Sequence, residues 1–284
     1  MNNADINNSS KVYALFYSFF LIPLMITIFG FLFFYLFKIL TYEKQDPYHL
    51  LNNINSGSQT KRWQSAYELS NLMSDESKIP TDQLFTSQMI SMYEKSIHDD
   101  PRVRTYLALA MGQTRNTLFC DILKVGFNDS NLENRIAVIK STGMIGCVDC
   151  ISSLNAIVDS KKDNQERLAA IISIGMLGDS DSEDILLKSL NDEEANIRWD
   201  SAISLLKMNN YAGIETIKKL LQRDYYENFP EVDGNEIDRA ILTVMALIDK
   251  NNSVYFENEL SLLADLDKNI KIREFALRIV TEYY

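Results

Sequence analysis

Cysteine, histidine, proline and glycine are all scarce in this sequence. With three cysteines and two histidines among 284 residues, there is little room for a disulfide framework or for a metal site with several ligands. The 5 prolines and 10 glycines stand beside plentiful leucine, isoleucine, valine and phenylalanine, which fits neither a disordered chain nor a fibrous one. We therefore expect one or two soluble domains with a sizeable core, without a metal or a cofactor.

Positive charge is also in short supply. The 28 lysines and arginines face 39 aspartates and glutamates, which gives a formal net charge of −11. A surface that binds nucleic acid needs basic residues to meet the phosphates, so we expect no nucleic acid partner. The acidic balance favours a protein partner with a basic surface instead.

One stretch lacks charge altogether, namely the 26 residues between Lys11 and Lys38. As a helix they would extend about 39 Å, enough to cross the roughly 30 Å of bilayer hydrocarbon with some tilt. The stretch holds eight phenylalanines, and tyrosines stand near its ends, where aromatic rings favour the membrane interface. We predict an N-terminal flank over residues 1–11 and a transmembrane helix over residues 12–40 that anchors the chain in the lipid bilayer.

A cleaved signal peptide is the main alternative for this helix. Its apolar stretch would be roughly 7–15 residues long, between a basic region and a small-residue cleavage site. Here the apolar run is longer, Lys11 stands against Asp5, and the sequence around Lys38 offers no such site. We therefore predict an uncleaved, single-pass anchor.

Two observations favour the cytoplasm for the long C-terminal part. The C-terminal side of the helix carries Lys38 and Lys44, then Lys61 and Arg62, against Lys11 and the α-amine on the other side. Unpaired cysteines also suit a reducing compartment. We expect a cytoplasmic soluble part, with the extracytoplasmic side as the alternative.

Beyond residue 40 the sequence is typical of helices throughout, and it repeats. Apolar residues recur at spacings of three and four, without sustained alternation of period two. Asp46-Pro47 begins the first helix and Gly57 ends it, which predicts a juxtamembrane helix or linker over 41–58. Seven arginines then recur in register, the central ones 31, 32 and 31 residues apart: Arg62, Arg104, Arg135, Arg167, Arg198, Arg239 and Arg273.

Each of these arginines, hereafter the arginine ladder, precedes mostly apolar or small residues at the third, fourth and seventh positions after it. A helix pair of about 30–45 residues cannot bury its apolar faces alone, so it stacks on its neighbours. Residues 100–112 (DPRVRTYLALAMG) and 167–179 (RLAAIISIGMLGD) resemble HEAT repeats, closest to the short bacterial type also found in phycobilisome lyases.

This resemblance covers residues 47–284 and is clearest over 99–208. It implies an all-α fold in which the transmembrane helix is followed by an α-solenoid of about seven HEAT-like helix pairs, placed here over 59–284. It also implies a right-handed superhelix of antiparallel helix pairs with a protein-binding concave face.

An acidic residue precedes most ladder arginines by four to six positions. We interpret each arginine as bridging to that carboxylate and tying the turn between repeats, because stacked repeats need the same contact each time. The alternative is a site for an anionic ligand. The acidic residues are Asp99, Asp100, Asp129, Asp163, Asp192, Asp233 and Asp267.

Two features suggest chemistry but lack the rest of a site. Cys147 and Cys150 have the spacing of a redox pair or half a zinc site, but Cys120, His49 and His98 stand in other units and no βαβ context is present. His98 precedes two aspartates without a nucleophile at a meaningful spacing. We expect no catalytic, cofactor-binding or metal-ligating residue.

Aromatic residues offer the best indication of a protein-binding surface. Trp63 and Trp199 each follow a ladder arginine, a shared position that favours packing over an exposed interface anchor. The step from Arg198 to Arg239 contains an acidic and aromatic insertion over 224–238, and long loops in compact repeats are uncommon without a role. The alternative is a solvated loop without a binding role. The segment does not have the regular spacing of oxygen ligands that a calcium-binding loop needs. We predict protein binding by Tyr225, Tyr226, Glu227, Phe229, Glu231 and Asp233.

The sequence therefore predicts a membrane-anchored scaffold or adaptor that binds another protein at the membrane surface, such as a membrane complex with a basic surface, and that is not an enzyme. The family resemblance supplies an enzymatic alternative, a lyase or isomerase for a tetrapyrrole of the phycobilin type. A further alternative is the same scaffold on the extracytoplasmic side.

Overall fold

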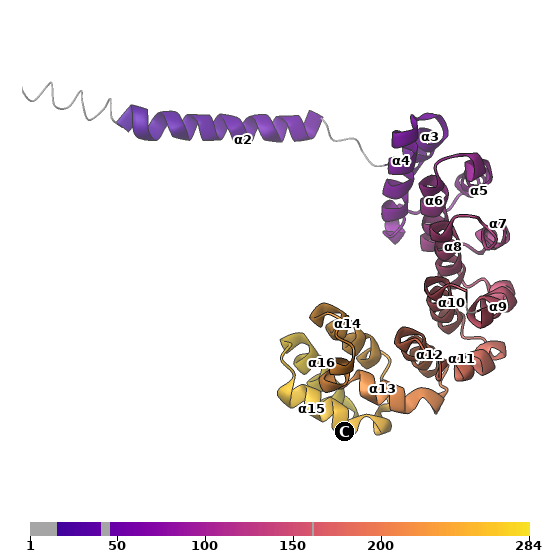
Figure 1. Cartoon of the computed structure of the whole chain (residues 1–284). Coiled ribbons are helices and arrows are strands. Elements are labelled where there is room, and N and C mark those ends of the chain that lie inside the picture. The colour runs from indigo at the N-terminus through magenta and orange to yellow at the C-terminus, as the bar shows by residue number, and fades with distance from the viewer. Residues whose placement is uncertain (1–15, 41–45, 161) are drawn as a thin grey trace, which may run out of the picture. The chain divides into compact units, whose positions relative to one another are not determined.

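The computed structural model describes residues 16–40, 46–160 and 162–284. It divides into two compact units, one that ends at Asp46 and one from Pro47 to Tyr284. The predicted N-terminal flank, the first part of the predicted transmembrane helix (12–15) and residues 41–45 of the predicted linker lie outside the described residues. All regular structure within the described ranges is helical, which confirms the all-α class (Figure 1).

The first unit contains one apolar helix. A π-helical turn, Tyr17–Leu21, leads into α2, Ile22–Leu40, and none of the apolar window within Tyr17–Ile39 is buried. Pro23 follows the π turn, and because proline lacks a backbone N–H, a wider turn before it accommodates the lost hydrogen bond. The helix is long and apolar enough to cross a membrane, a property that an anchor shares with a signal sequence.

The second unit is an α-solenoid of alternating outer and inner helices. The outer helices are α3 (Pro47–Ser56), α5 (Gln83–Lys95), α7 (Cys120–Gly126), α9 (Ile151–Ser160), α11 (Glu183–Ser189), α13 (Ile214–Leu220) and α15 (Glu257–Leu266). The inner helices are α4 (Gln59–Leu72), α6 (Pro101–Thr114), α8 (Leu132–Ile145), α10 (Asn164–Leu177), α12 (Ala195–Lys207), α14 (Gly234–Met245) and α16 (Ile270–Tyr283). These pairs confirm the predicted array of about seven.

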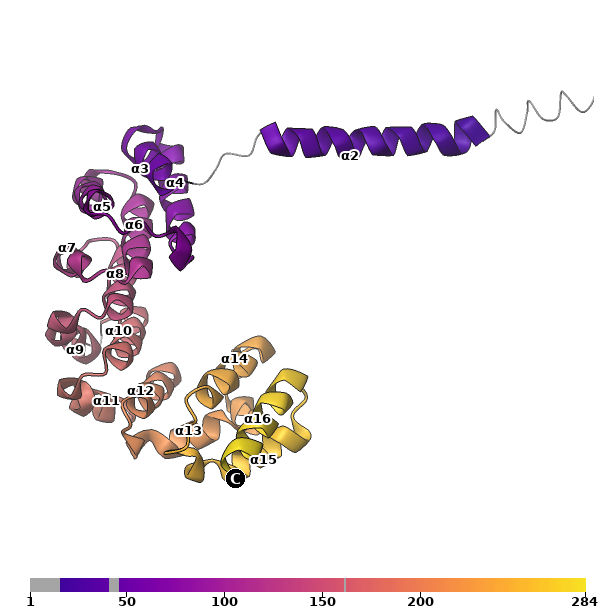
Figure 2. The same cartoon turned by 180° about the vertical axis from the view of Figure 1, so that it is seen from behind.

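The inner and outer helices lie on opposite sides of the curved solenoid. From α4 to α12 the inner helices follow one another along the inside of the curve, and the outer helices α5, α7, α9 and α11 lie along its outside (Figures 1 and 2). Each inner helix packs directly on the next through α12, as α6 does on α4 and α8. From α4 to α12 the inner face is therefore a continuous surface built from one helix of each repeat.

The array begins earlier than 59, the position we expected. Leu50, Leu51 and Ile54 of α3 are buried, and α3 packs on α4 and α5. The segment predicted as a juxtamembrane helix or linker over 41–58 therefore supplies, from Pro47 onward, the first outer helix of the array. Its apolar spacing serves the same packing as in the later repeats.

Short 3₁₀ turns and capping residues join these helices. The turns are Glu76–Lys78, Ser96–His98, Thr117–Phe119, Val148–Cys150, Ser180–Ser182, Tyr211–Gly213, Arg223–Asn228 and Ser253–Tyr255. Asp100, Asn131 and Asp163 cap the N-termini of α6, α8 and α10 through their side chains. Gly146 and Gly178 end α8 and α10 with φ of 88° and 67°, a left-handed conformation that favours glycine.

The buried apolar residues form two clusters that meet at α12. The first extends from α3 to α12 and includes Leu69, Met111 and Leu205. The second begins on α12 with Trp199 and Ala202 and extends to α16. Because α12 contributes to both clusters, it connects the two halves of the solenoid.

A seam of glycine and serine sets the distance between consecutive inner helices. Ser173 on α10 donates through Oγ to the carbonyl oxygen of Ile139 on α8 at 2.8 Å, and its backbone lies against Gly143. A Cβ atom on Gly143 would lie 2.7 Å from the Cα of Ser173, too close for two carbon atoms. The same arrangement recurs between Gly112 and Ser141 and between Gly175 and Ser204.

Gly143→Ala is expected to destabilise the solenoid by about 1–3 kcal/mol, because the added methyl group must push α8 away from α10. Gly234→Ala is the matched control, since a Cβ at Gly234 meets no atom within 4 Å. Thermal unfolding of the full chain, followed by circular dichroism, should show a lower Tm for the first variant and an unchanged Tm for the second. Equal Tm values would contradict the close approach of the two helices.

Candidate functional site

The arginine ladder lies along the edge of the solenoid formed by the N-termini of the inner helices. Arg104 pairs with Asp129 at 2.7 Å, and Arg167 pairs with Asp192. Each of these carboxylates belongs to the turn that precedes the next inner helix, 25 residues after its arginine. The side chain of an arginine near the start of a helix points back toward the N-terminus, which places it in the layer of these turns.

The predicted direction of these bridges is wrong. We expected each arginine to reach the carboxylate four to six residues before it, but at Arg135, Arg198 and Arg273 that residue offers its backbone carbonyl instead. Arg135 donates to the carbonyl of Asp129 at 2.7 Å, and Arg198 donates to that of Asp192 at 2.8 Å. Asp129 and Asp192 therefore each join two arginines, the earlier one through the carboxylate and the later one through the carbonyl.

Two of the remaining ladder arginines make contacts of the same kind, whereas Arg239 does not and another arginine occupies its place. Arg62 pairs with Asp99 at 2.7 Å and Arg273 donates to the carbonyl of Asp267. Arg239 makes a long 3.4 Å contact with a carbonyl of its own helix. Its place opposite Asp267 is taken by Arg223, which pairs with Asp267 and Asp238 at 2.6 Å. Sequence reasoning missed Arg223 because the insertion displaces it from the repeat register.

The cysteines do not form the pair that their spacing suggested. Cys147 is joined by a disulfide to Cys120 at the start of α7, and Cys150 is free and buried. Burial raises the pKa of the Cys150 thiol, which disfavours a reactive thiolate. The expectation of unpaired cysteines is therefore wrong, and the disulfide removes one of the two arguments for the cytoplasmic side.

The histidines, the other residues considered as metal ligands, lie on different elements of the repeat array. His49 lies on α3 and His98 in the turn Ser96–His98. Across residues 16–40, 46–160 and 162–284, no group of three or more histidine, cysteine or acidic side chains could hold a metal ion.

The aromatic part of the insertion faces inward. Tyr226 is buried and donates to the carbonyl of Leu220 at 2.9 Å, and Tyr225 accepts a hydrogen bond from the indole of Trp199 at 3.1 Å. The rings of Tyr225, Tyr226 and Phe229 lie 6.1, 5.8 and 4.9 Å from the Trp199 ring. These aromatic side chains pack against the solenoid, so Tyr226 in particular does not present its ring to a partner.

The acidic part of the insertion is exposed, with one structural role among its members. Asp233 caps α14 and forms a capping box with Glu236, whereas Glu227 and Glu231 lie on the surface. The structure thus brings the predicted aromatic residues together around Trp199 and leaves two predicted acidic residues free to meet a partner. Protein binding by this segment remains a prediction.

Asp200, beside Trp199 on α12, is a titratable group that sequence reasoning missed. Burial raises the pKa of Asp200 to about 6, and the positive charge of Lys207 opposes this shift only in part. Its folded pKa lies above the ordinary value, so protonation favours the folded state. The stabilisation is complete below about pH 4 and is lost as the pH rises through about 6.

Asp200→Asn should therefore stabilise the protein at pH 7.5 by up to about 3 kcal/mol and have little effect at pH 4, where Asp200 is neutral. Comparing the Tm of the two proteins across this range measures the effect. A Tm difference that does not change with pH would contradict the shifted pKa. Asp265→Asn supplies the control, because Asp265 is exposed at the surface.

A row of apolar side chains follows the surface of the inner helices. The first and fifth positions after a ladder arginine lie on one face of a helix because they are four residues apart. We call the half-buried or exposed apolar residues at these positions the inner stripe: Trp63, Tyr67, Leu109, Ile136, Leu168 and Ile172. At the next repeat, Trp199 and Ile203 hold the same positions but are buried.

Side chains of neighbouring inner helices contact one another along the stripe. The guanidinium of Arg102 on α6 stacks 4.2 Å over the ring of Trp63 on α4. The rings of Tyr67 and Tyr106 lie 5.1 Å apart edge to face. Sequence reasoning singled out Trp63 alone, although the same register search would have found the other members.

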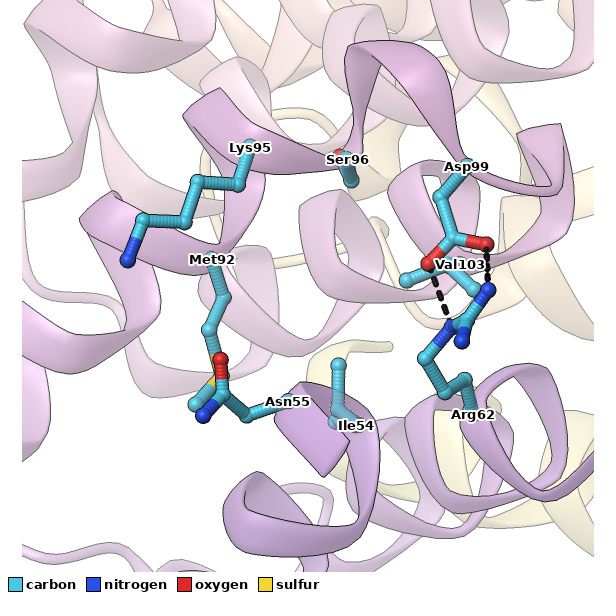
Figure 3. A pocket seen from close by; sticks show the side chains of 8 residues that line it. All are labelled: Ile54, Asn55, Arg62, Met92, Lys95, Ser96, Asp99 and Val103. Atoms are coloured by element: carbon cyan, nitrogen blue, oxygen red, sulfur yellow. Dashed lines mark hydrogen bonds and ion pairs between the residues drawn. The ribbon is translucent and has the colours of Figure 1, made fainter. Parts of the chain in front are cut away.

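Three pockets lie between the ends of successive outer helices, each beside an arginine and its acidic partner. The one in Figure 3 has a volume of about 200 Å³, with the Arg62–Asp99 pair on one side and Lys95, Met92 and Asn55 on the other. A pocket of about 470 Å³ lies beside Arg104, and one of about 500 Å³ beside Arg223. All three guanidinium groups are bound by carboxylates of the protein, which favours a structural role over an anion site.

Comparisons with known proteins agree with this architecture. Residues 151–228 match the family model of HEAT repeats. The solved complex of CpcE and CpcF of phycocyanin lyase from Nostoc sp. PCC7120 is similar, with a TM-score of 0.57 at 14% identity over 86% of this chain and 97% of that one. A computationally designed armadillo repeat protein for modular peptide recognition has a TM-score of 0.40 at 15% identity, over 84% and 99% of the two chains. No curated protein sequence matches.

Identities this low show a shared fold and leave activity open. Repeated helix pairs, one arginine at the start of most inner helices, and the matched segment at the centre of the array all agree. The chain has the fold of a HEAT-like repeat protein, an α-solenoid that follows one apolar helix in the sequence.

Proposed function

We propose that this protein is a non-enzymatic scaffold, anchored in a membrane by α2, that binds another protein along the inner stripe. The stripe is the observation that carries the proposal. Its tryptophan, tyrosine and aliphatic side chains remain accessible on a rigid surface, and aromatic anchors of this kind dominate the energy of protein interfaces. Repeat solenoids commonly use such extended surfaces to bind other proteins.

Charge and anchoring support the same role. The formal net charge of −11 favours encounter with a basic surface and disfavours adsorption to anionic lipids. A membrane anchor raises the effective concentration of a partner in the same bilayer. The partner we expect is accordingly a protein with a basic surface, within or beside the membrane.

A photo-crosslinking experiment on native membranes tests this proposal. The residue p-benzoylphenylalanine, placed at Tyr67, should give one discrete protein adduct, and placed at Leu118 it should give none. Both side chains are exposed, but only Tyr67 belongs to the inner stripe. Adding Ile136→Asp should abolish the Tyr67 adduct.

The proposal fails if Tyr67 gives no adduct or if both positions give the same ones. The purified full chain should also be colourless. A bound pigment that the Ile136→Asp variant loses would favour the lyase or isomerase alternative over the scaffold.

For the side of the membrane, the disulfide supports the extracytoplasmic alternative over our initial expectation. Disulfides persist in oxidising compartments and are rare in the cytosol. The charge argument also loses weight, because Arg62 is paired with Asp99 within the solenoid. We propose that the solenoid lies outside the cytoplasm.

A further inference from the structure

The pocket between α13 and α15 has an apolar wall beside its charged groups. Leu262 and Leu266, four residues apart on α15, line it and are 58% and 77% exposed. Two buried leucines, Leu221 and Leu263, line the inner part of the pocket. With a volume of about 500 Å³, the pocket is large enough for an aliphatic side chain and the adjoining backbone.

The charged groups around the pocket are predominantly acidic. Arg223 is neutralised by Asp267 and Asp238, which pair with it at 2.6 Å. Asp224 and Glu259 also line the pocket, and neither makes an ion pair or a side-chain hydrogen bond within the part of the chain that the structure describes. Two uncompensated carboxylates beside exposed leucines favour a ligand that is both cationic and apolar.

We propose that this pocket docks a basic segment of a partner protein. An aliphatic side chain of the segment packs on Leu262 and Leu266, and flanking lysines or arginines pair with Asp224 and Glu259. The site lies on the outer-helix side of the array, separate from the inner stripe, and shares with the proposed function only the premise that the partner is a protein.

Fluorescence anisotropy of defined peptides tests the site. The full chain, in nanodiscs of phosphatidylcholine, is titrated into a labelled heptapeptide with a central leucine between lysines. Two comparison peptides carry serine in place of leucine or glutamate in place of lysine. We expect each change to weaken binding about tenfold, because one loses the apolar contact and the other the ion pairs.

Variants of the protein separate this pocket from general attraction to an acidic surface. Leu262→Ser with Leu266→Ser should reduce affinity for the leucine peptide to that of the serine peptide. Asp224→Asn with Glu259→Gln should weaken it about tenfold. The controls Leu277→Ser and Glu257→Gln alter an exposed leucine and an exposed acid outside the pocket, and should change Kd by less than about twofold.

Equal weakening by the controls, or equal binding of the leucine and serine peptides, would overturn the proposal. Circular dichroism confirms that each variant is folded. Because these variants leave the inner stripe intact, crosslinking from Tyr67 should be unaffected. Failure of the peptide assay and failure of the scaffold proposal are therefore distinguishable.

Discussion

Asp192→Ala is expected to destabilise the solenoid by about 3–5 kcal/mol, because it leaves the buried guanidinium of Arg167 without its carboxylate. The side chains of Arg167 and Asp192 are only 5% and 9% exposed. The same substitution removes the carboxylate that accepts from the backbone N–H of Glu194 at 3.1 Å, in the turn that leads into α12. Two neighbouring repeats would therefore lose a shared contact.

Thermal unfolding of the full chain measures this effect as a fall in Tm of about 10 °C for a domain of this size. Asp121→Ala is the control, since the carboxylate of Asp121 is 95% exposed and pairs with Lys124 at the surface. Exposed pairs contribute little, so that variant should change the stability by less than about 0.5 kcal/mol. Similar losses from both substitutions would show that the ladder pair contributes no more than a surface contact.

The repeat fold was predictable because the period is written directly in the spacing of arginines and small residues. Arg104, Arg135 and Arg167 each begin an inner helix at the expected place. The partner of each arginine was not predictable. A carboxylate before the helix and one in the next repeat are equally consistent with the sequence, and only the stacking of repeats brings the second one within reach.

The candidate site was harder to predict, because the same composition suits a loop and a core. Tyr225 and Phe229 stand among acidic residues, as they would in a docking loop, yet they pack on Trp199. The signal for this packing was Trp199 itself, because its position in the repeat register favours burial. A docking loop exposes its aromatic rings and a core buries them, and which of the two occurs depends on how the insertion folds back onto the solenoid.

The disulfide could also have been anticipated from the repeat. Cys120 and Cys147 are 27 residues apart, slightly less than one repeat period, which places them in neighbouring units. Cys147 and Cys150 share one turn and drew attention through a familiar spacing. In a solenoid, separation by about one period is the better guide to contact.

Cys120→Ser with Cys147→Ser is expected to destabilise the solenoid by about 3–4 kcal/mol in the chain-entropy description, given the size of the loop that the bond closes. The loop spans α7 and α8, and both lie in the first core cluster. Tm values with and without reductant should converge in the double variant and differ in the unaltered protein. Cys150→Ser, which keeps the disulfide, controls for the loss of a thiol.

The oxidation state of these cysteines in native membranes then decides whether the solenoid lies on the cytoplasmic or the extracytoplasmic side. Modification with a maleimide polymer after denaturation should label one thiol, Cys150, without reductant and all three after reduction. The Cys150→Ser variant should be labelled only after reduction. Three labelled thiols without reductant would place the solenoid in a reducing compartment and overturn the extracytoplasmic proposal. The scaffold proposal does not depend on this outcome, because the inner stripe does not include either cysteine of the bond.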